Sequence, residues 1–193
     1  GGKILAKALG QVAKMAKPGI STLELDKAAE SFILQQGAQP AFKGYEKFPY
    51  SLCVSVNDVV VHGLPSGYIL KNGDVVGLDL GVLWKGYNTD MAVTVAVGEV
   101  SFEIKRMMDV AKKSLRLAIK KARPGVTTGD IGNTVQRFVE DQGFSVIRDL
   151  CGHGIGKEVH EDPQVPNYGT RHKGMALREG MVICIEPMVT MGD

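Results

Sequence analysis

The sequence predicts an α+β fold built from two copies of one helix-plus-strand unit. Residues 17–22 (KPGIST) match residues 123–128 (RPGVTT) at an offset of 106. Residues 70–79 (LKNGDVVGLD) match residues 177–186 (LREGMVICIE) at an offset of 107, and both stretches end on an acidic residue. Because two independent matches share nearly one offset, we infer an internal duplication whose halves face each other about a pseudo-two-fold axis.

Length and composition narrow the class of protein. The 193 residues predict a single domain, with a first half of about residues 1–100 and a second half of about residues 101–193. No run of 18 or more apolar residues is present, which excludes a membrane-spanning protein. The net charge of +2 neither requires nor forbids nucleic-acid binding. Three cysteines without metal-finger spacing indicate reduced thiols and a cytoplasmic protein.

Periodicity predicts the elements of the first half in order. Residues 1–17 show helical spacing of apolar side chains between lysines, which indicates an amphipathic helix rather than a signal peptide. A Pro-Gly turn, a Ser/Thr cap and a second helix ended by Gly37 follow. Residues 54–61 predict a strand, and residues 74–83 and 87–97 predict an antiparallel hairpin.

The second half repeats this pattern. Residues 102–122 predict a helix whose basic face we interpret as solvated rather than as a contact with ribosomal RNA. A second turn, cap and helix end at Gly143, and residues 181–189 predict an apolar strand.

The predicted hairpin carries two acidic residues, Asp79 and Asp90. Their positions predict that they lie directly opposite each other across a two-residue turn near Trp84, with both carboxylates on one face. An exposed position would be the ordinary interpretation of either residue alone, but Asp79 lies between two leucines in mid-strand. Two ionised carboxylates this close repel each other, and a shared cation is the simplest compensation.

Histidines and a third carboxylate complete the candidate set. Glycines surround His153 in residues 151–156 (CGHGIG) and permit close approach of the backbone to a metal, whereas an isolated His is more often a hydrogen-bonded or surface residue. His160 lies seven residues further on, too far for an HExxH pair, so one histidine can be a ligand and the other a catalytic donor. Glu186 is the counterpart of Asp79 in the duplication. Carboxylates with one imidazole suit divalent Mn, Fe, Co or Zn.

These residues, in this order, resemble methionine aminopeptidases of the short bacterial type (type I), which have the pita-bread fold shared with prolidase and aminopeptidase P. The resemblance runs from the first helix to Asp193 and is most specific in residues 55–63, 151–156 and 160–165. It implies antiparallel sheets around a central metal site. It also implies four metal ligands: Asp79, Asp90, His153 and Glu186, with Asp90 as a bridge between two ions.

The resemblance further implies removal of the initiator Met from nascent proteins by attack of a metal-bound hydroxide. His160 would stabilise the oxyanion, His62 would contact the scissile amide, and Glu186 would carry the proton. We therefore expect a cytoplasmic, monomeric hydrolase that acts on nascent polypeptides, associates weakly with ribosomes, and binds neither membranes nor DNA.

Recognition of Met requires a narrow apolar pocket. Tyr45, Phe48 and Cys53 resemble pocket residues of the family, although ordinary core packing is an equal interpretation. Phe42 stands where the family commonly has Cys, and Val159 stands where it commonly has Phe. These differences predict a reshaped pocket.

The end of the sequence differs from the duplicated pattern. Asp90 follows Asp79 by eleven residues, whereas only seven residues follow Glu186. By the resemblance, a bridging Glu belongs further downstream, so we expect the C-terminal portion to be missing, with one ion and weak activity for this 193-residue chain. Two alternatives remain: a non-catalytic pita-bread module that binds peptides or ribosomes, and an Xaa-Pro peptidase. The retained histidines favour the aminopeptidase.

Overall fold

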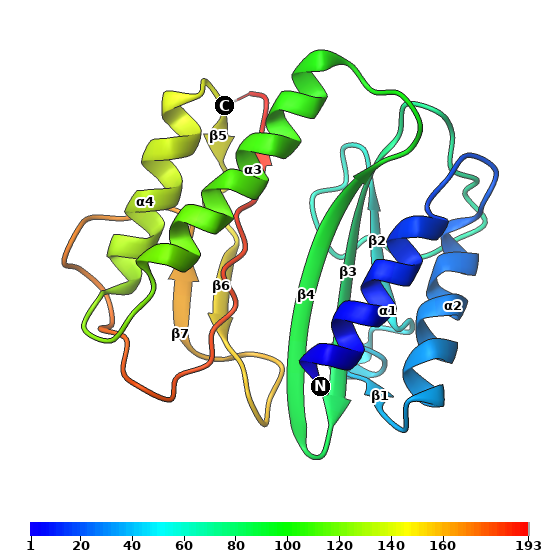
Figure 1. Cartoon of the computed structure of the whole chain (residues 1–193), viewed down its shortest axis with the longest axis horizontal. Coiled ribbons are helices and arrows are strands. Elements are labelled where there is room, and N and C mark those ends of the chain that lie inside the picture. Colours follow the sequence, from blue (N-terminus) through cyan, green and yellow to red (C-terminus); the bar gives the residue numbers. More distant parts are fainter. Residues whose placement is uncertain (193) are drawn as a thin grey trace. The chain divides into compact units, whose positions relative to one another are not determined.

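A computed structural model describes residues 1–192 of the chain and divides into two compact units (Figure 1). The first unit contains residues 1–101 together with residues 156–159, and the second contains residues 102–155 and the chain from residue 160 onward. That the two units form one domain stays a prediction. Among the described residues, no helix has the length and apolar character needed to cross a membrane.

The first unit is an antiparallel sheet of four strands with two helices packed on it. Strand β3 is its centre and pairs with each of the other three strands. Its elements are α1 (Gly2–Met15), α2 (Thr22–Gln35), β1 (Gln39–Pro40), the short 3-10 helix η1 (Tyr45–Lys47), β2 (Leu52–Val56), β3 (Val75–Trp84) and β4 (Tyr87–Ala96). The predicted first helix and the predicted hairpin are thus confirmed.

Alternation along β3 gives its two faces different roles. Leu78, Leu80 and Val82 are fully buried in the same apolar cluster as the inward residues of α1 and α2. Successive side chains of a strand point to opposite faces, so Asp79 and Gly81 lie on the face away from these helices. The helices therefore stabilise one face of the sheet and leave the other for polar groups.

The hairpin turn lies one residue later than the sequence predicts. Lys85 and Gly86 occupy the turn with φ of 52° and 79°, and Trp84 pairs with Tyr87. Two successive positive φ values are typical of a type I′ turn, in which glycine adopts the second position without strain.

This shift changes how the two carboxylates meet. Asp90 lies opposite Gly81, and Asp79 lies opposite Ala92, so the prediction that the two acids face each other directly is wrong. The displacement is two residues along the strand, which preserves the face. Asp79 and Asp90 are therefore diagonal neighbours on one side of the sheet, close enough to share a ligand.

The second unit packs two helices on short strands (Figure 1). Strand β5 pairs with β8 and β6 pairs with β7, all antiparallel. Its elements are α3 (Phe102–Lys121), α4 (Thr128–Asp141), β5 (Ser145–Val146), β6 (Cys151–Gly154), β7 (Glu161–Pro166) and β8 (Val189–Thr190). The predicted helices are confirmed.

Backbone hydrogen bonds repeat at the offsets found in the sequence. Gly19 N donates to Leu70 O at 2.9 Å, and Gly125 N donates to Leu177 O at the same distance. Helices α2 and α4 both begin with a capping box. The side chain of Ser21 or Thr127 accepts a hydrogen bond from the backbone N–H three residues later, and the acidic side chain of that later residue accepts one from the backbone N–H of Ser21 or Thr127. The duplication is therefore confirmed within each unit.

Two predicted strands are shorter than expected. Residues 57–61 do not continue β2, because Asn57 has a φ of 54° and its side chain bonds to Asp74 and to the N–H of Val75. Residues 181–188 pair only at isolated points before β8. Pro187 has no N–H to donate to a ladder, so the continuous strand predicted over residues 181–189 is wrong.

Candidate active site

The first unit presents two acidic side chains on the face of its sheet that points away from α1 and α2. Asp79 and Asp90 are half-buried there, and Cys53 lies opposite Asp79 on β2. Burial, followed by the charges of Asp79 and Asp90, raises the pKa of the Cys53 thiol to about 12. At neutral pH this thiol stays protonated and serves as an apolar wall rather than as a nucleophile.

The second unit brings His153 and Glu186 together. His153 is 7% exposed, its Nδ1 lies 2.8 Å from the carbonyl oxygen of Gly154, and its Nε2 lies 3.2 Å from Oε1 of Glu186. A carbonyl oxygen can only accept, so Nδ1 carries a proton. In the neutral imidazole Nε2 then presents a lone pair toward the carboxylate, where a metal ion can bind between them, and in the imidazolium Nε2–H donates to the carboxylate.

This arrangement fits a metal ion. A ring N–H held by a backbone carbonyl is the usual way in which a protein fixes the tautomer of a ligating imidazole. An imidazole nitrogen and a carboxylate oxygen are ligand atoms suited to divalent Mn, Fe, Co and Zn. Structural zinc sites, by contrast, are rich in thiolate ligands. The residues present in the second unit therefore fit the predicted divalent ion.

Glycines place His153, as the sequence indicates. A Cβ on Gly152 would lie 2.2 Å from the carbonyl oxygen of Cys184, and a Cβ on Gly154 would lie 2.1 Å from that of Asp162. The backbone N–H of Cys184 donates to the carbonyl oxygen of His153 at 2.7 Å. Only residues without side chains permit β6 to lie this close to both neighbouring segments.

His160 accompanies His153 in the second unit. The two imidazole rings have centroids 4.3 Å apart and meet edge to face at 70°. The His160 side chain is exposed, whereas that of His153 is buried. An exposed imidazole beside a buried one matches the predicted division between a catalytic donor and a ligand, although the roles themselves stay predictions.

The predicted pocket residues form one apolar cluster in the first unit. Phe42, Cys53 and Val159 are buried together, and Tyr45 and Phe48 pack against them. The cluster thus includes all three residues that resemble the family pocket and both positions that differ from it. Burial, with the charges of nearby Glu46 and Glu158, raises the pKa of the Tyr45 phenol, which therefore stays neutral.

His62 lies on the loop after β2, where its side chain is exposed and its φ is 55°. The adjacent Gly63 anchors this loop: its N–H donates to Oγ of Ser55 at 3.1 Å, and its carbonyl accepts from Val54 N at 2.8 Å. A Cβ at residue 63 would lie 2.2 Å from the carbonyl oxygen of Val54. The loop therefore holds His62 at a defined place beside β2.

Three polar residues near these groups are not identified by the sequence. Asn88 bonds to residues 156 and 157, Asn167 donates to the carbonyl oxygen of Glu186 at 2.7 Å, and Asp26 accepts from Leu52 N. Burial raises the pKa of Asp26 although these N–H groups oppose the shift. Their partners lie far away in sequence; the only local signal is the position of Asp26 on the apolar face of α2.

Known proteins match the chain throughout. The family model described as metallopeptidase family M24 matches residues 1–193. The methionine aminopeptidase of Clostridium perfringens is 49% identical over 192 residues, which cover 100% of this chain and 77% of that protein. Methionine aminopeptidase 1 of Bacillus subtilis is 47% identical with the same coverage.

Solved structures agree with this likeness. The crystal structure of methionine aminopeptidase from Thermotoga maritima has a TM-score of 0.98 and 45% identity, and the match covers 100% of this chain and 78% of that one. Prolidase from Pyrococcus horikoshii has a TM-score of 0.83 and 29% identity, with 96% and 51% covered. The mixed fold with antiparallel sheets is therefore the predicted pita-bread fold, and the chain belongs to metallopeptidase family M24.

Proposed function

We propose that this chain is a metal-dependent hydrolase of the methionine aminopeptidase kind, which removes the N-terminal Met from nascent polypeptides. The observation that carries the proposal is the 3.2 Å approach of His153 Nε2 to Glu186 Oε1, which sets an imidazole nitrogen and a carboxylate oxygen side by side in a chain with this family likeness. We assign Asp79 and Asp90 as the other two protein ligands.

The ion supplies the electrophilic part of the chemistry. When bound, a divalent metal polarises the scissile carbonyl and lowers the pKa of a water molecule. Glu186 lies beside the imidazole and is suited to hold the proton that the nucleophile loses and to pass it to the leaving amine. His160, exposed and adjacent to His153, donates a hydrogen bond to the developing oxyanion.

Substrate recognition falls to the first unit in this proposal. The Phe42, Cys53 and Val159 cluster, with Tyr45 and Phe48, is apolar and suits an unbranched thioether side chain. The exposed His62 would contact the scissile amide.

Two other functions are disfavoured. An Xaa-Pro peptidase would be consistent with the prolidase likeness, but that likeness is weaker in identity and covers only half of the prolidase chain. A non-catalytic module would have no use for two histidines placed edge to face, one of them beside a half-buried carboxylate.

Release of Met tests the proposal. We expect hydrolysis of Met-Ala-Ser on addition of Mn, Co or Fe, none after chelation, and no hydrolysis of Xaa-Pro dipeptides. His153→Ala is expected to lower kcat/KM at least about 100-fold, since it removes a ligand. His172→Ala, at an 88% exposed side chain, is the matched control. Absence of turnover with every ion tried would refute the enzyme; cleavage of Xaa-Pro alone would support the prolidase alternative.

The number and kind of ions are part of the proposal. The four proposed protein ligands would hold one ion of Mn, Fe, Co or Zn, and a second ion would bind more weakly. Titration calorimetry with Mn is expected to show one strong site that is lost in Glu186→Gln. Two sites of equal affinity would contradict this stoichiometry.

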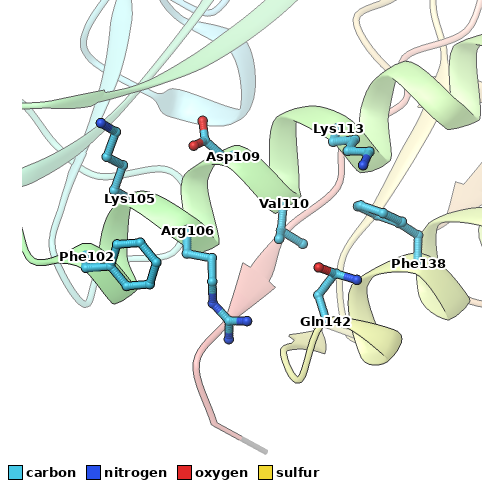
Figure 2. Close-up of a pocket in the computed structure, with 8 residues that line it drawn as sticks. All are labelled: Phe102, Lys105, Arg106, Asp109, Val110, Lys113, Phe138 and Gln142. Carbon is cyan, nitrogen blue, oxygen red and sulfur yellow. The ribbon is translucent and has the colours of Figure 1, made fainter.

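We also propose a monomeric, cytoplasmic protein that associates weakly with ribosomes. No disulfide joins Cys53, Cys151 and Cys184, as expected in a reducing compartment. Helix α3 holds seven basic and two acidic residues, whereas the whole chain has a net charge of only +2. Figure 2 shows Lys105, Arg106 and Lys113 around an open pocket between α3 and α4. A solvated face is the ordinary interpretation of these charges, but a helix this basic also suits the phosphate backbone of RNA, and it is the surface on which the proposed ribosome association depends.

Cosedimentation with ribosomes tests this association. Binding is expected at low salt, with loss at high salt and in the double variant Lys105→Glu, Lys112→Glu. Lys14→Glu reverses an exposed charge of α1 and serves as the control. Equal cosedimentation of all three proteins would exclude α3 as the contact.

A further inference from the structure

Asn88 ties the strand that bears Asp90 to the segment that bears Val159. It lies on β4 and is 8% exposed. Its backbone N–H donates to the carbonyl oxygen of Gly156 at 2.7 Å. Its side-chain Nδ2 donates to the carbonyl oxygens of Lys157 at 2.8 Å and of Gly156 at 3.4 Å.

The segment of residues 156–159 is fixed by hydrogen bonds at its start and by an apolar side chain at its end. Gly156 N donates to the carbonyl oxygen of Glu158 at 3.1 Å, and the two middle residues are exposed. Only Val159 is buried, at 5% exposure, against Phe42. The segment belongs to the first unit, although the chain on either side of it belongs to the second. A donor within the first unit is therefore needed to hold it.

We propose that Asn88 is a positioning residue that sets side-chain specificity by holding Val159 in the wall of the pocket. The proposal rests on the proposed aminopeptidase function. It extends that function to Asn88, which is neither one of the proposed metal ligands nor one of the proposed catalytic residues. Asn88 links Asp90 to Val159. It lies two residues from Asp90 on the same face of β4, and it binds the backbone just before Val159.

The chemistry of the amide explains why the residue type matters. Two carbonyl oxygens face Nδ2, and both can only accept hydrogen bonds. A carboxylate of the same shape would place a third acceptor against them and push the segment away, while the backbone bond to Gly156 would remain. Displacement of Val159 would move the wall of the pocket, and because His160 follows directly in the sequence, the rate of reaction is expected to change together with side-chain preference.

The test compares Asn88→Asp with wild type on Met-Ala-Ser and Leu-Ala-Ser. We expect KM for the Met peptide to rise about tenfold and the preference for Met over Leu to fall about tenfold, with any loss of kcat the same for both peptides. Asn133→Asp is the matched control, because Asn133 Nδ2 also donates to a loop carbonyl, that of Gly169 at 3.0 Å, but in the second unit. A fall in kcat at constant KM, or KM and preference within about twofold of wild type, would overturn the proposal.

A double-mutant cycle shows whether Asn88 acts through Val159. In a Val159→Ala background, Asn88→Asp is expected to change the preference for Met by less than about twofold, because the side chain it positions is gone. An unchanged effect would overturn the proposal.

Binding without chemistry separates this proposal from the proposed function. L-norleucine has the length of Met and can occupy the pocket without being cleaved. If wild type releases no Met from any peptide, the proposed function fails, and calorimetry with norleucine then decides on Asn88. Weaker binding by Asn88→Asp than by Asn133→Asp supports the positioning role, and equal binding by both overturns it.

Discussion

His153 owes its proposed role to a single local hydrogen bond. Its Nδ1 donates to the carbonyl oxygen of the next residue, Gly154, which leaves the other ring nitrogen as a lone-pair donor aimed at Glu186. The sequence identifies the residue through the surrounding glycines, but the tautomer follows only from the carbonyl that the backbone places beside the ring.

The side chains of Phe42 and Val159 differ in size from those common at these positions in the family, in opposite directions. Where the family commonly has a small and a large residue, this chain has a large and a small one, and both pack with Cys53. Val159 is only 5% exposed, so a phenylalanine at this position beside Phe42 would overfill the cluster. Val159→Phe is therefore expected to lower kcat/KM for Met-Ala-Ser about tenfold or more, and Phe42→Cys in addition is expected to restore it.

Steady-state kinetics of the two single variants and the double variant check this compensation. If Phe42→Cys worsens the Val159→Phe enzyme, the two side chains do not share one space.

At the scale of elements, the capping box of α4 predicts a dependence of stability on pH. The side-chain hydroxyl of Thr127, followed by its backbone N–H, holds the pKa of Asp130 at about 2. A pKa lowered in the folded state contributes stability above the unfolded value of about 3.9, and this contribution is lost as pH falls toward 2. Asp130→Asn is expected to lower Tm at pH 7, with the difference from wild type shrinking below about pH 4.

Thermal denaturation between pH 7 and pH 2 measures this difference. Asp141→Asn, at the other end of α4, is the control. A difference between wild type and Asp130→Asn that stays constant down to pH 2 would contradict the assignment.

Replacement of glycine by alanine is expected to have opposite effects on stability at Gly152 in β6 and at Gly10 in α1. Gly152→Ala would drive a methyl group into the carbonyl of Cys184, which costs about 1–3 kcal/mol of unfolding free energy. Gly10 lies in α1 with nothing near its Cβ position, so Gly10→Ala is expected to stabilise by about 0.5–1 kcal/mol. Urea denaturation of both variants checks the pair, and the same sign for both would be inconsistent with close approach at β6.

For the whole molecule, metal and stability are linked. An ion that binds only the folded protein stabilises it by about 2.7 kcal/mol at 100 times its dissociation constant. Mn is therefore expected to raise Tm and a chelator to reverse this effect. Asp79→Asn and Glu186→Gln are expected to abolish the Mn-dependent rise, and Asp109→Asn, an exposed residue of α3, is expected to retain it. A full Mn-dependent rise in Asp79→Asn would remove that residue from the ligand set.

The repeated sequence determined the larger part of this molecule: two helix-plus-strand units, both capping boxes, the hairpin and the glycine frame of His153. These features depend on local periodicity and on backbone conformations that few residue types adopt, so they can be predicted from a single sequence. The pairing of Asp79 and Asp90 was predicted two residues out of place, because the turn consists of Lys85 and Gly86 rather than of Trp84 and Lys85. A preference for positive φ, and not strand hydrophobicity, decided the position of the turn.

Only the tertiary structure decided which distant residues act together. The Asn88 bonds to residues 156 and 157, the approach of His153 to Glu186, and the cluster that joins Phe42 to Val159 all connect segments tens of residues apart. Such contacts leave no local pattern, because a side chain's partners depend on how the chain folds back on itself. The sequence by itself determined which residues carry the chemistry; the fold decided their orientation, their protonation and their neighbours.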